Sequence, residues 1–523
     1  MIRMNKRVLI LPTLAMMLMT MGSCTKDDTA VVQSIDEYVA QKPVPVTFST
    51  YNADAATTRA GTPGSINLDA QLKTKGFGVF AYYTENTNFN YMPIGTRNLI
   101  PDFMYNEHIA WDGTNNKWDY FDPDDQKFWP NDFNGNGNPV DTHTPAAPDA
   151  TGTKLNYISF FAYAPYAGEF TQTSATTRSG ATPPTTSGDG TNSGVIAASG
   201  NAFNGDPFLT YRMSNDASKV VDLVWGTAGG TDNGDNVVGT AQNGGMVTRS
   251  VDNGIATAVV AVDPTNIDMT KQKTDGKVKF NFKHALAKVG GSADGSTAIN
   301  AGLTVDLLID TDGLPGSPAT ADKPNNTKVT VKSITITHDD ATTGTPAVLT
   351  NPMASTGVFN LATGEWDVTA ADATDATTYF TINHEINQNG GTQGNTLNAA
   401  IKEPDTDPAV WTDLDGINGV LTGTPTNVYG VETTPILFLP GTTPHLKFTI
   451  EYCVRTKDTK LAKGFTEVWQ TITKTVAFTA PVVQNMQYNI VMHLGLTSVK
   501  FDASVSTWGD GGSTAVDLPI NVM

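Results

Sequence analysis

The sequence is poor in cysteine, in charged residues and, above all, in positive charge. Its 523 residues include only two cysteines, Cys24 and Cys453, which excludes a disulfide framework or a cysteine-rich zinc site. Charged residues make up 16% of the chain, and 33 Lys and Arg against 52 Asp and Glu leave a net charge of −19. Because such a field repels phosphate backbones, we expect no nucleic-acid partner.

Glycine and proline, by contrast, are plentiful. The chain has 48 Gly and 29 Pro among long Thr, Asn and Asp stretches, which leave helices little room. Hydrophobic residues still make up 39%, enough for sizeable cores. Beyond the N-terminus, no segment is long and apolar enough to span a membrane. The composition therefore predicts a β-rich chain that lies outside the cytoplasm.

The N-terminus has the pattern of a bacterial lipoprotein signal peptide over residues 1–23. Basic residues precede an apolar run from Val8 to Met21, which is shorter than the about 20 residues that a membrane span needs. The run ends in Met-Gly-Ser-Cys24, which resembles a lipobox with Met21 in place of the usual Leu. We therefore expect lipid on Cys24, a lipidated linker over 24–42 and an anchor in the outer membrane. The alternative is a plain secretory signal with an incidental cysteine.

The lysine and two acids over residues 26–28 resemble the surface-export signal of Bacteroidota lipoproteins. The location expected is therefore the cell surface.

The mature chain contains short alternating apolar segments separated by turn-rich loops, which is the pattern of an all-β sandwich. The first such segment, 44–50, places Val44, Val46 and Phe48 on one face. We expect two tandem sandwiches with long loops, over 43–272 and 276–508. The further strands predicted are 76–83, 104–111, 157–163, 220–225, 277–282, 285–289, 328–338, 357–361, 436–440, 446–454, 470–478, 488–494 and 499–508.

Several short pieces, in this order, resemble the fimbrillin family of Bacteroidota, the type V pilins. The pieces are Trp118-Asp-Tyr, Lys127-Phe-Trp-Pro, 158–166, 222–226, 278–288, 357–366, 437–441, 485–494 and 499–508. The resemblance implies two transthyretin-like β-sandwich domains and a subunit of surface fibres. It also implies that an Arg-specific surface protease removes the first strand, and that a segment of another subunit fills the groove left behind.

Cleavage between Arg59 and Ala60 would release the 44–50 strand, because Arg59 follows that strand in a polar, Gly-containing stretch. The alternative is an ordinary loop arginine, since a Thr-Arg pair followed by a small residue recurs at Arg178 and Arg249. The candidate donor strand is the tail over 509–523. Its Val516, Leu518, Ile520 and Val522 alternate with polar residues and Pro519. The same alternation fits a tail that completes its own sandwich.

The remaining motifs indicate structure rather than chemistry. The Asp132–Asn138 run matches half of an EF-hand loop but has His143 where the bidentate Glu belongs, so we expect no metal. Asp310–Gly313 and Asp413–Gly416 are turn formers. We expect His284 and His493 to be structural, and Cys453 to be a buried thiol. Packing is also expected for the aromatic side chains Trp111, Trp118 and Trp129 rather than stacking on a sugar.

No motif supplies a nucleophile with its base, so we expect a protein that is not an enzyme and has no cofactor. The first reading is a structural subunit, in the stalk of a surface fimbria that supports adhesion. Its partners would be other copies of itself or related pilins. The alternative is a monomeric or fibre-tip adhesin that binds glycan or host protein, with a surface glycosidase as a more distant third.

Overall fold

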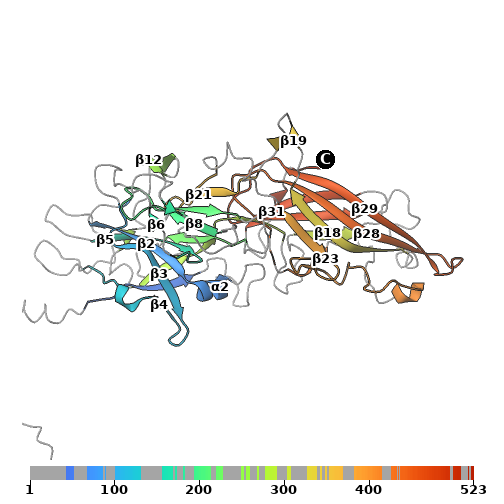
Figure 1. Ribbon diagram of the computed structural model, residues 1–523, viewed down its shortest axis with the longest axis horizontal. Helices are drawn as coiled ribbons and strands as arrows, with labels where there is room; N and C mark the ends of the chain where they lie inside the picture. Colours follow the sequence, from blue (N-terminus) through green and yellow to red (C-terminus); the bar gives the residue numbers. More distant parts are fainter. Residues whose placement is uncertain are drawn as a thin grey trace, which may run out of the picture. The chain divides into compact units, whose positions relative to one another are not determined.

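We describe a computed structural model of the chain, which forms two compact units, residues 1–45 and 46–523. The structure describes residues 43–51, 68–85, 89, 100–130, 156–168, 171–172, 181–182, 194–213, 220–227, 249–252, 255–259, 268–269, 277–290, 303–307, 327–338, 342–343, 348–349, 353–368, 382–414, 426–432, 434, 436–494, 499–507, 516–517 and 520–522. Within these segments the fold is all-β, as predicted, with four large sheets and three small hairpins (Figure 1). The hairpins are β6 (Thr171–Gln172) with β7 (Ala181–Thr182), β11 (Arg249–Asp252) with β12 (Ile255–Val259), and β19 (Thr342–Thr343) with β20 (Val348–Leu349).

The first sheet closes on itself. Its strand order is β14-β1-β4-β3-β2-β5-β10-β15, with β13 also paired to β5. The strands are β1 (Thr47–Tyr51), β2 (Phe77–Glu85), β3 (Met104–Asp112), β4 (Lys117–Tyr120), β5 (Tyr157–Ala164), β10 (Val224–Thr227), β13 (Asp268–Met269), β14 (Lys277–Asn281) and β15 (Lys283–His284). Since β14 and β15 lie at opposite edges and only Phe282 separates them in the chain, the sheet curls until its edges meet.

Both faces of this sheet are buried at β2. On β2, Phe77 and Val79 point into the interior of the closed sheet, while Phe80 and Tyr82 point outward to a second core. This alternation follows from the period of two in a β-strand. The helix α2 (Leu68–Lys75) precedes β2 and is followed by Gly76, whose φ of +69° favours glycine.

The second sheet covers the outer face of the first. Its strands are, in order, β22 (Trp366–Asp367), β21 (Thr356–Asn360), β9 (Phe208–Arg212) and β8 (Gly194–Ala198). Trp225 of the first sheet packs on Phe359 of the second, with ring centroids 5.2 Å apart. These two sheets therefore form a β-sandwich.

The third and fourth sheets form the C-terminal sandwich. The third contains β25 (Thr426–Asn427), β17 (Leu303–Leu307), β30 (Met486–Leu494), β16 (Ala287–Val289), β27 (Ile436–Phe438), β31 (Val499–Thr507) and β32 (Val516–Asp517). The fourth contains β26 (Tyr429–Val431), β24 (Thr396–Leu397), β23 (Asn383–Asn387), β18 (Thr327–His338), β28 (His445–Lys457), β29 (Phe465–Phe478) and β33 (Ile520–Val522), and Figure 1 shows its long strands β18, β28 and β29. Phe448 and Phe501 meet between the two sheets at 5.1 Å.

Strand pairing crosses the boundary expected between residues 272 and 276. The strands β14 and β15 follow that boundary in the chain, yet they pair with β1 and β10 of the first sheet. Likewise β21 pairs with β9 over five residue pairs. Alternation in a sequence indicates which face of a strand is buried but not which strand lies beside it.

Candidate functional site

The strand β1 is the first strand of the described chain, yet it lies between two others. On one side it pairs in parallel with β14, from Thr47 opposite Lys277 to Tyr51 opposite Asn281. On the other side it pairs antiparallel with β4, with Phe48 opposite Trp118. An N-terminal strand in an interior position of a sheet supplies hydrogen bonds to both neighbours.

The side chains of Phe48 in β1 and of Val46, which directly precedes β1, enter an aromatic core. Val46 and Phe48 are buried. The Phe48 ring lies 5.7 Å from Tyr120, and 6.2 Å from both Phe77 and Phe280. Burial of Val46 and Phe48 contributes roughly 3–6 kcal/mol at about 1.5–3 kcal/mol each.

Polar contacts hold β1 at both ends. At its beginning, the backbone N–H of Val46 donates to the carbonyl oxygen of Lys127 at 2.9 Å. Near its other end, Nε1 of Trp118 donates to Oγ1 of Thr50 at 3.1 Å. Burial raises the pKa of the Tyr120 hydroxyl beside this core, so the phenol stays neutral.

We call the space occupied by β1 the β1 slot; it lies between β14 and β4 and is lined by Phe77, Trp118, Tyr120 and Phe280. A slot without β1 would present two unpaired strand edges and an apolar groove. Such a groove accepts an extended segment through main-chain hydrogen bonds and alternate apolar side chains. The arrangement is therefore suited to binding a strand rather than to chemistry.

The tail pairs within its own chain. Val516 and Asp517 of β32 lie opposite Val505 and Ser504 of β31, in the third sheet. The next strand, β33, pairs antiparallel with β29 of the fourth sheet over 476–478. The tail thus contributes one short strand to each sheet of the C-terminal sandwich.

The structure describes some of the predicted site residues. Val516, Ile520 and Val522 lie in β32 and β33. The lipidation residue Cys24, the cleavage residues Arg59 and Ala60, and Leu518 lie outside the described residues. Those four remain predictions.

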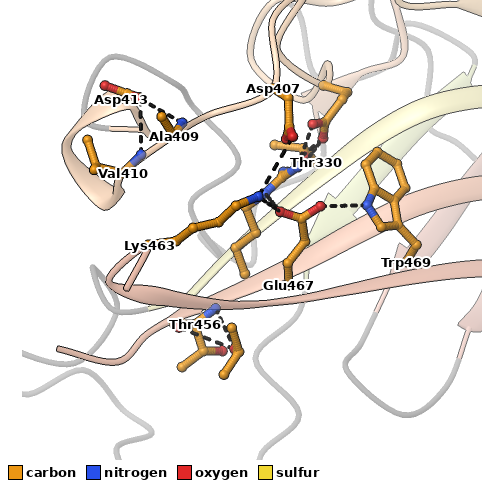
Figure 2. A network of polar contacts seen from close by, with 12 residues as sticks. Thr330, Asp407, Ala409, Val410, Asp413, Thr456, Lys463, Glu467 and Trp469 are labelled. Carbon is orange, nitrogen blue, oxygen red and sulfur yellow. Dashed lines mark hydrogen bonds and ion pairs between the residues drawn. The ribbon is translucent and has the colours of Figure 1, made fainter. Parts of the chain in front are cut away.

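The motifs that we interpreted as structural are partly described. The 132–143 and 310–313 stretches lie outside the described residues, while the Asp413 carboxylate accepts the N–H groups of Ala409 and Val410 (Figure 2). This carboxylate therefore acts as a turn former, as predicted. Within the segments that the structure describes, no three His, Cys, Asp or Glu side chains gather as metal ligands. No helix of these segments has the length and apolar character to cross a membrane.

The tryptophans of the predicted sugar-stacking alternative are packing residues. Trp118 and Trp129 are buried, and Trp111 packs against the same core. Nδ1 of the buried His284 lies 2.7 Å from Asp222, a structural role as predicted. Cys453 is a buried thiol, and burial raises its pKa to about 12, which makes it unreactive at neutral pH.

A polar network at the β28–β29 hairpin was not predicted (Figure 2). The buried guanidinium of Arg455 donates to both carboxylate oxygens of Glu403, at 2.7 and 3.0 Å. Glu403 also accepts from the hydroxyl of Thr330. At the surface, Glu467 accepts from Nε1 of the half-exposed Trp469 at 2.8 Å. The residues of this network come from distant parts of the chain, so no local sequence motif predicts the network.

The fold defines this chain as an all-β protein built from sandwiches. No family model matches the sequence. It is 26% identical over 235 residues to the fimbrium subunit Fim1C of Phocaeicola vulgatus, in a match that spans 44% of this chain and 40% of the relative. A fimbrial protein from Bacteroides vulgatus has a crystal structure that is 18% identical, with a TM-score of 0.49, over 89% of this chain and 99% of that chain.

The match to a fimbrium subunit confirms the predicted resemblance to the Bacteroidota fimbrillins. The chain matches less than half the length of this curated relative.

Proposed function

We propose that this protein is a subunit of a cell-surface fimbria and that subunits join by strand exchange at the β1 slot. The observation that carries the proposal is the interior position of β1, with β14 on one side and β4 on the other. Residues 52–67, which contain Arg59 and Ala60, connect β1 to α2. An Arg-specific surface protease that cuts there would detach β1 from the body and leave the slot available.

The donor is the tail of a second subunit. Its alternation of Val516, Leu518, Ile520 and Val522 matches the alternation of Val46 and Phe48 in the 44–50 segment. Ten residues over 514–523 span about 33 Å, which exceeds the about 17 Å of a five-residue strand such as β1. Pro519 has no N–H to donate to a neighbouring strand. The lost hydrogen bond costs little if Pro519 faces β4, because β1 pairs with β4 at a single residue.

Before cleavage, the protein is a precursor held on the outer membrane by lipid on Cys24. Loss of residues 1–59 would remove the anchor together with β1, so the same cut releases the subunit and prepares the slot. The released subunit then forms part of the stalk of a fibre that supports adhesion.

The tail pairs with β31 and β29 of its own chain. This pairing favours a second candidate, a monomeric or fibre-tip adhesin whose tail stays in its own sandwich. Its ligand would be a glycan or a host protein, and the half-exposed Trp469 is an aromatic side chain that could contact one.

The experiment uses protein that lacks residues 1–24, treated with an Arg-specific protease and analysed by unboiled, non-reducing electrophoresis. Parallel samples carry Arg59→Ala or end at Ser513. A ladder of polymers that requires both Arg59 and the tail would support strand exchange. Clean cleavage at Arg59 without polymers would support the adhesin instead.

A further inference from the structure

The β1 slot contains a buried polar group as well as apolar side chains. The indole of Trp118 is buried, and its Nε1–H donates to Oγ1 of Thr50 at 3.1 Å. A buried N–H that loses its acceptor weakens binding, because the group has given up its hydrogen bond to water. A strand that replaces β1 therefore binds best if it brings a hydroxyl to the place of Thr50.

The tail matches the segment that contains β1 when one of the two sequences is read backwards. From Thr50 back to Val44 the segment is Thr-Ser-Phe-Thr-Val-Pro-Val, and from Thr514 forward to Ile520 the tail is Thr-Ala-Val-Asp-Leu-Pro-Ile. Both begin with threonine, have proline in the sixth place, and have apolar residues in the third, fifth and seventh places. This direction supplies the hydroxyl of Thr514.

A match in the same direction as β1 is shorter. Leu-Pro-Ile-Asn-Val over 518–522 then lies on Val-Pro-Val-Thr-Phe over 44–48. In that register residues 514–523 bring no hydroxyl to Trp118. Other registers in this direction that keep the apolar tail residues inward place an apolar side chain where Thr50 lies.

The opposite direction also places opposite charges side by side. Thr47 of β1 lies opposite Lys277 of β14. Residues directly opposite each other on neighbouring strands have their side chains on the same face, where opposite charges are stabilising. The backward match has Asp517 in the place of Thr47, whereas the same-direction match has the uncharged Asn521 there. Reversal also exchanges parallel pairing with β14 for antiparallel pairing, which is slightly more stable per residue.

We propose that the donated tail enters the β1 slot in the direction opposite to β1, with Thr514 in the place of Thr50. The apolar residues and the proline then take these places: Val516 that of Phe48, Leu518 that of Val46 and Pro519 that of Pro45. The larger leucine partly offsets the smaller valine. This inference rests on the proposed function and adds the direction and the register of the donor.

Peptide binding tests the direction. The protein lacks residues 1–24, ends at Ser513 and is cleaved after Arg59, so that its slot exchanges β1 for an added peptide of residues 514–523. The remaining cysteine of this protein, Cys453, is buried and does not compete in crosslinking.

The first readout is affinity. A peptide with Thr514→Val should bind about tenfold more weakly than the wild-type peptide, because the buried N–H of Trp118 is left without its acceptor. A peptide with Thr514→Ser keeps a hydroxyl and should bind like the wild-type peptide. Trp118→Phe protein should bind the wild-type and Thr514→Val peptides equally, which assigns the loss to this contact.

The second readout is disulfide crosslinking, which requires no change in the core. Ser49 lies opposite Lys279 of β14, so a peptide with Ala515→Cys in the place of Ser49 should crosslink to Lys279→Cys protein. A peptide with Asn521→Cys should crosslink neither to Lys279→Cys nor to Lys277→Cys protein. The same-direction match would instead join Asn521→Cys to Lys277→Cys.

The outcomes separate the direction from the proposed function. Failure of the wild-type peptide to bind would overturn the proposed function. Binding of the wild-type peptide together with crosslinking of Asn521→Cys to Lys277→Cys, or with an unchanged affinity of the Thr514→Val peptide, would overturn the direction alone.

Discussion

Phe48 is the side chain that most firmly holds β1 in its slot. It touches Phe77, Tyr120 and Phe280. We expect Phe48→Ala to lower the free energy of unfolding of the uncleaved protein by about 3–5 kcal/mol, because a cavity replaces the ring. Denaturant unfolding of the variant and of Ser49→Ala, whose side chain is only half-buried, measures the difference. Equal stability of the two would show that the slot tolerates an empty aromatic site.

Glu107, near the beginning of β1, makes stability depend on pH. Burial raises its pKa from 4.5 to about 7, against the opposing effect of Lys127, whose Nζ is 3.6 Å from the carboxylate. The folded state therefore binds this proton more tightly than the unfolded state. The resulting stabilisation is complete below pH 4.5 and is lost as the pH rises towards about 7.

We expect Glu107→Gln to remove this pH dependence. The melting temperature of the variant should change less between pH 4.5 and pH 7 than that of wild type. Asp119→Asn, at a more exposed acid of the neighbouring strand β4, is the control. A variant whose melting temperature follows wild type across this range would contradict the assignment.

The Arg455–Glu403 pair is a buried ion pair, so removing one partner leaves an uncompensated charge. We expect Arg455→Met to lower the free energy of unfolding by about 3–5 kcal/mol. Removing both charges, as Arg455→Met with Glu403→Leu, should cost less than the single change. Chemical denaturation of the wild type, the two single variants and the double variant gives the coupling energy, and additive losses would contradict a paired role.

At the scale of elements, alternation predicted most strands well. The strands β18, β30 and β31 begin within two residues of the predicted positions, because each shows one buried face in its sequence. Alternation did not predict β9 or β17, which are only five residues long.

The site was only partly predictable, because alternation in the sequence does not indicate which strands pair. The 44–50 segment was predicted as a strand that a protease could remove, but its partner β14 lies far along the chain and no local signal names it. Phe121 and Trp469 could not be distinguished from core aromatic residues, since exposure depends on tertiary packing.

The tail is the element whose role differs most between the two proposed functions. In the single chain β32 and β33 cover edges of β31 and β29. We expect protein that ends at Ser513 to show faster hydrogen exchange at 476–478, because these residues lose the β33 partner. Exchange over 445–455 of β28 is the internal control, since β28 keeps both its neighbours. Unchanged exchange at 476–478 would show that the tail leaves this edge readily.

At the scale of the whole molecule, strand exchange gives each subunit one acceptor and one donor, so the two kinds of variant should terminate opposite ends of a chain. Protein that ends at Ser513 can accept a strand after cleavage but cannot donate one. Arg59→Ala protein keeps β1 and can donate its tail but cannot accept.

We expect either variant, mixed at one part in ten with cleaved wild type, to limit the mean polymer to on the order of ten subunits, because each one blocks head-to-tail growth at one end. Electron microscopy of fibre length measures the effect. The control is Arg59→Ala protein that also ends at Ser513, which can neither accept nor donate and should leave the length unchanged. Shortening by this inert protein would mean that the subunits join through surfaces other than the slot and the tail.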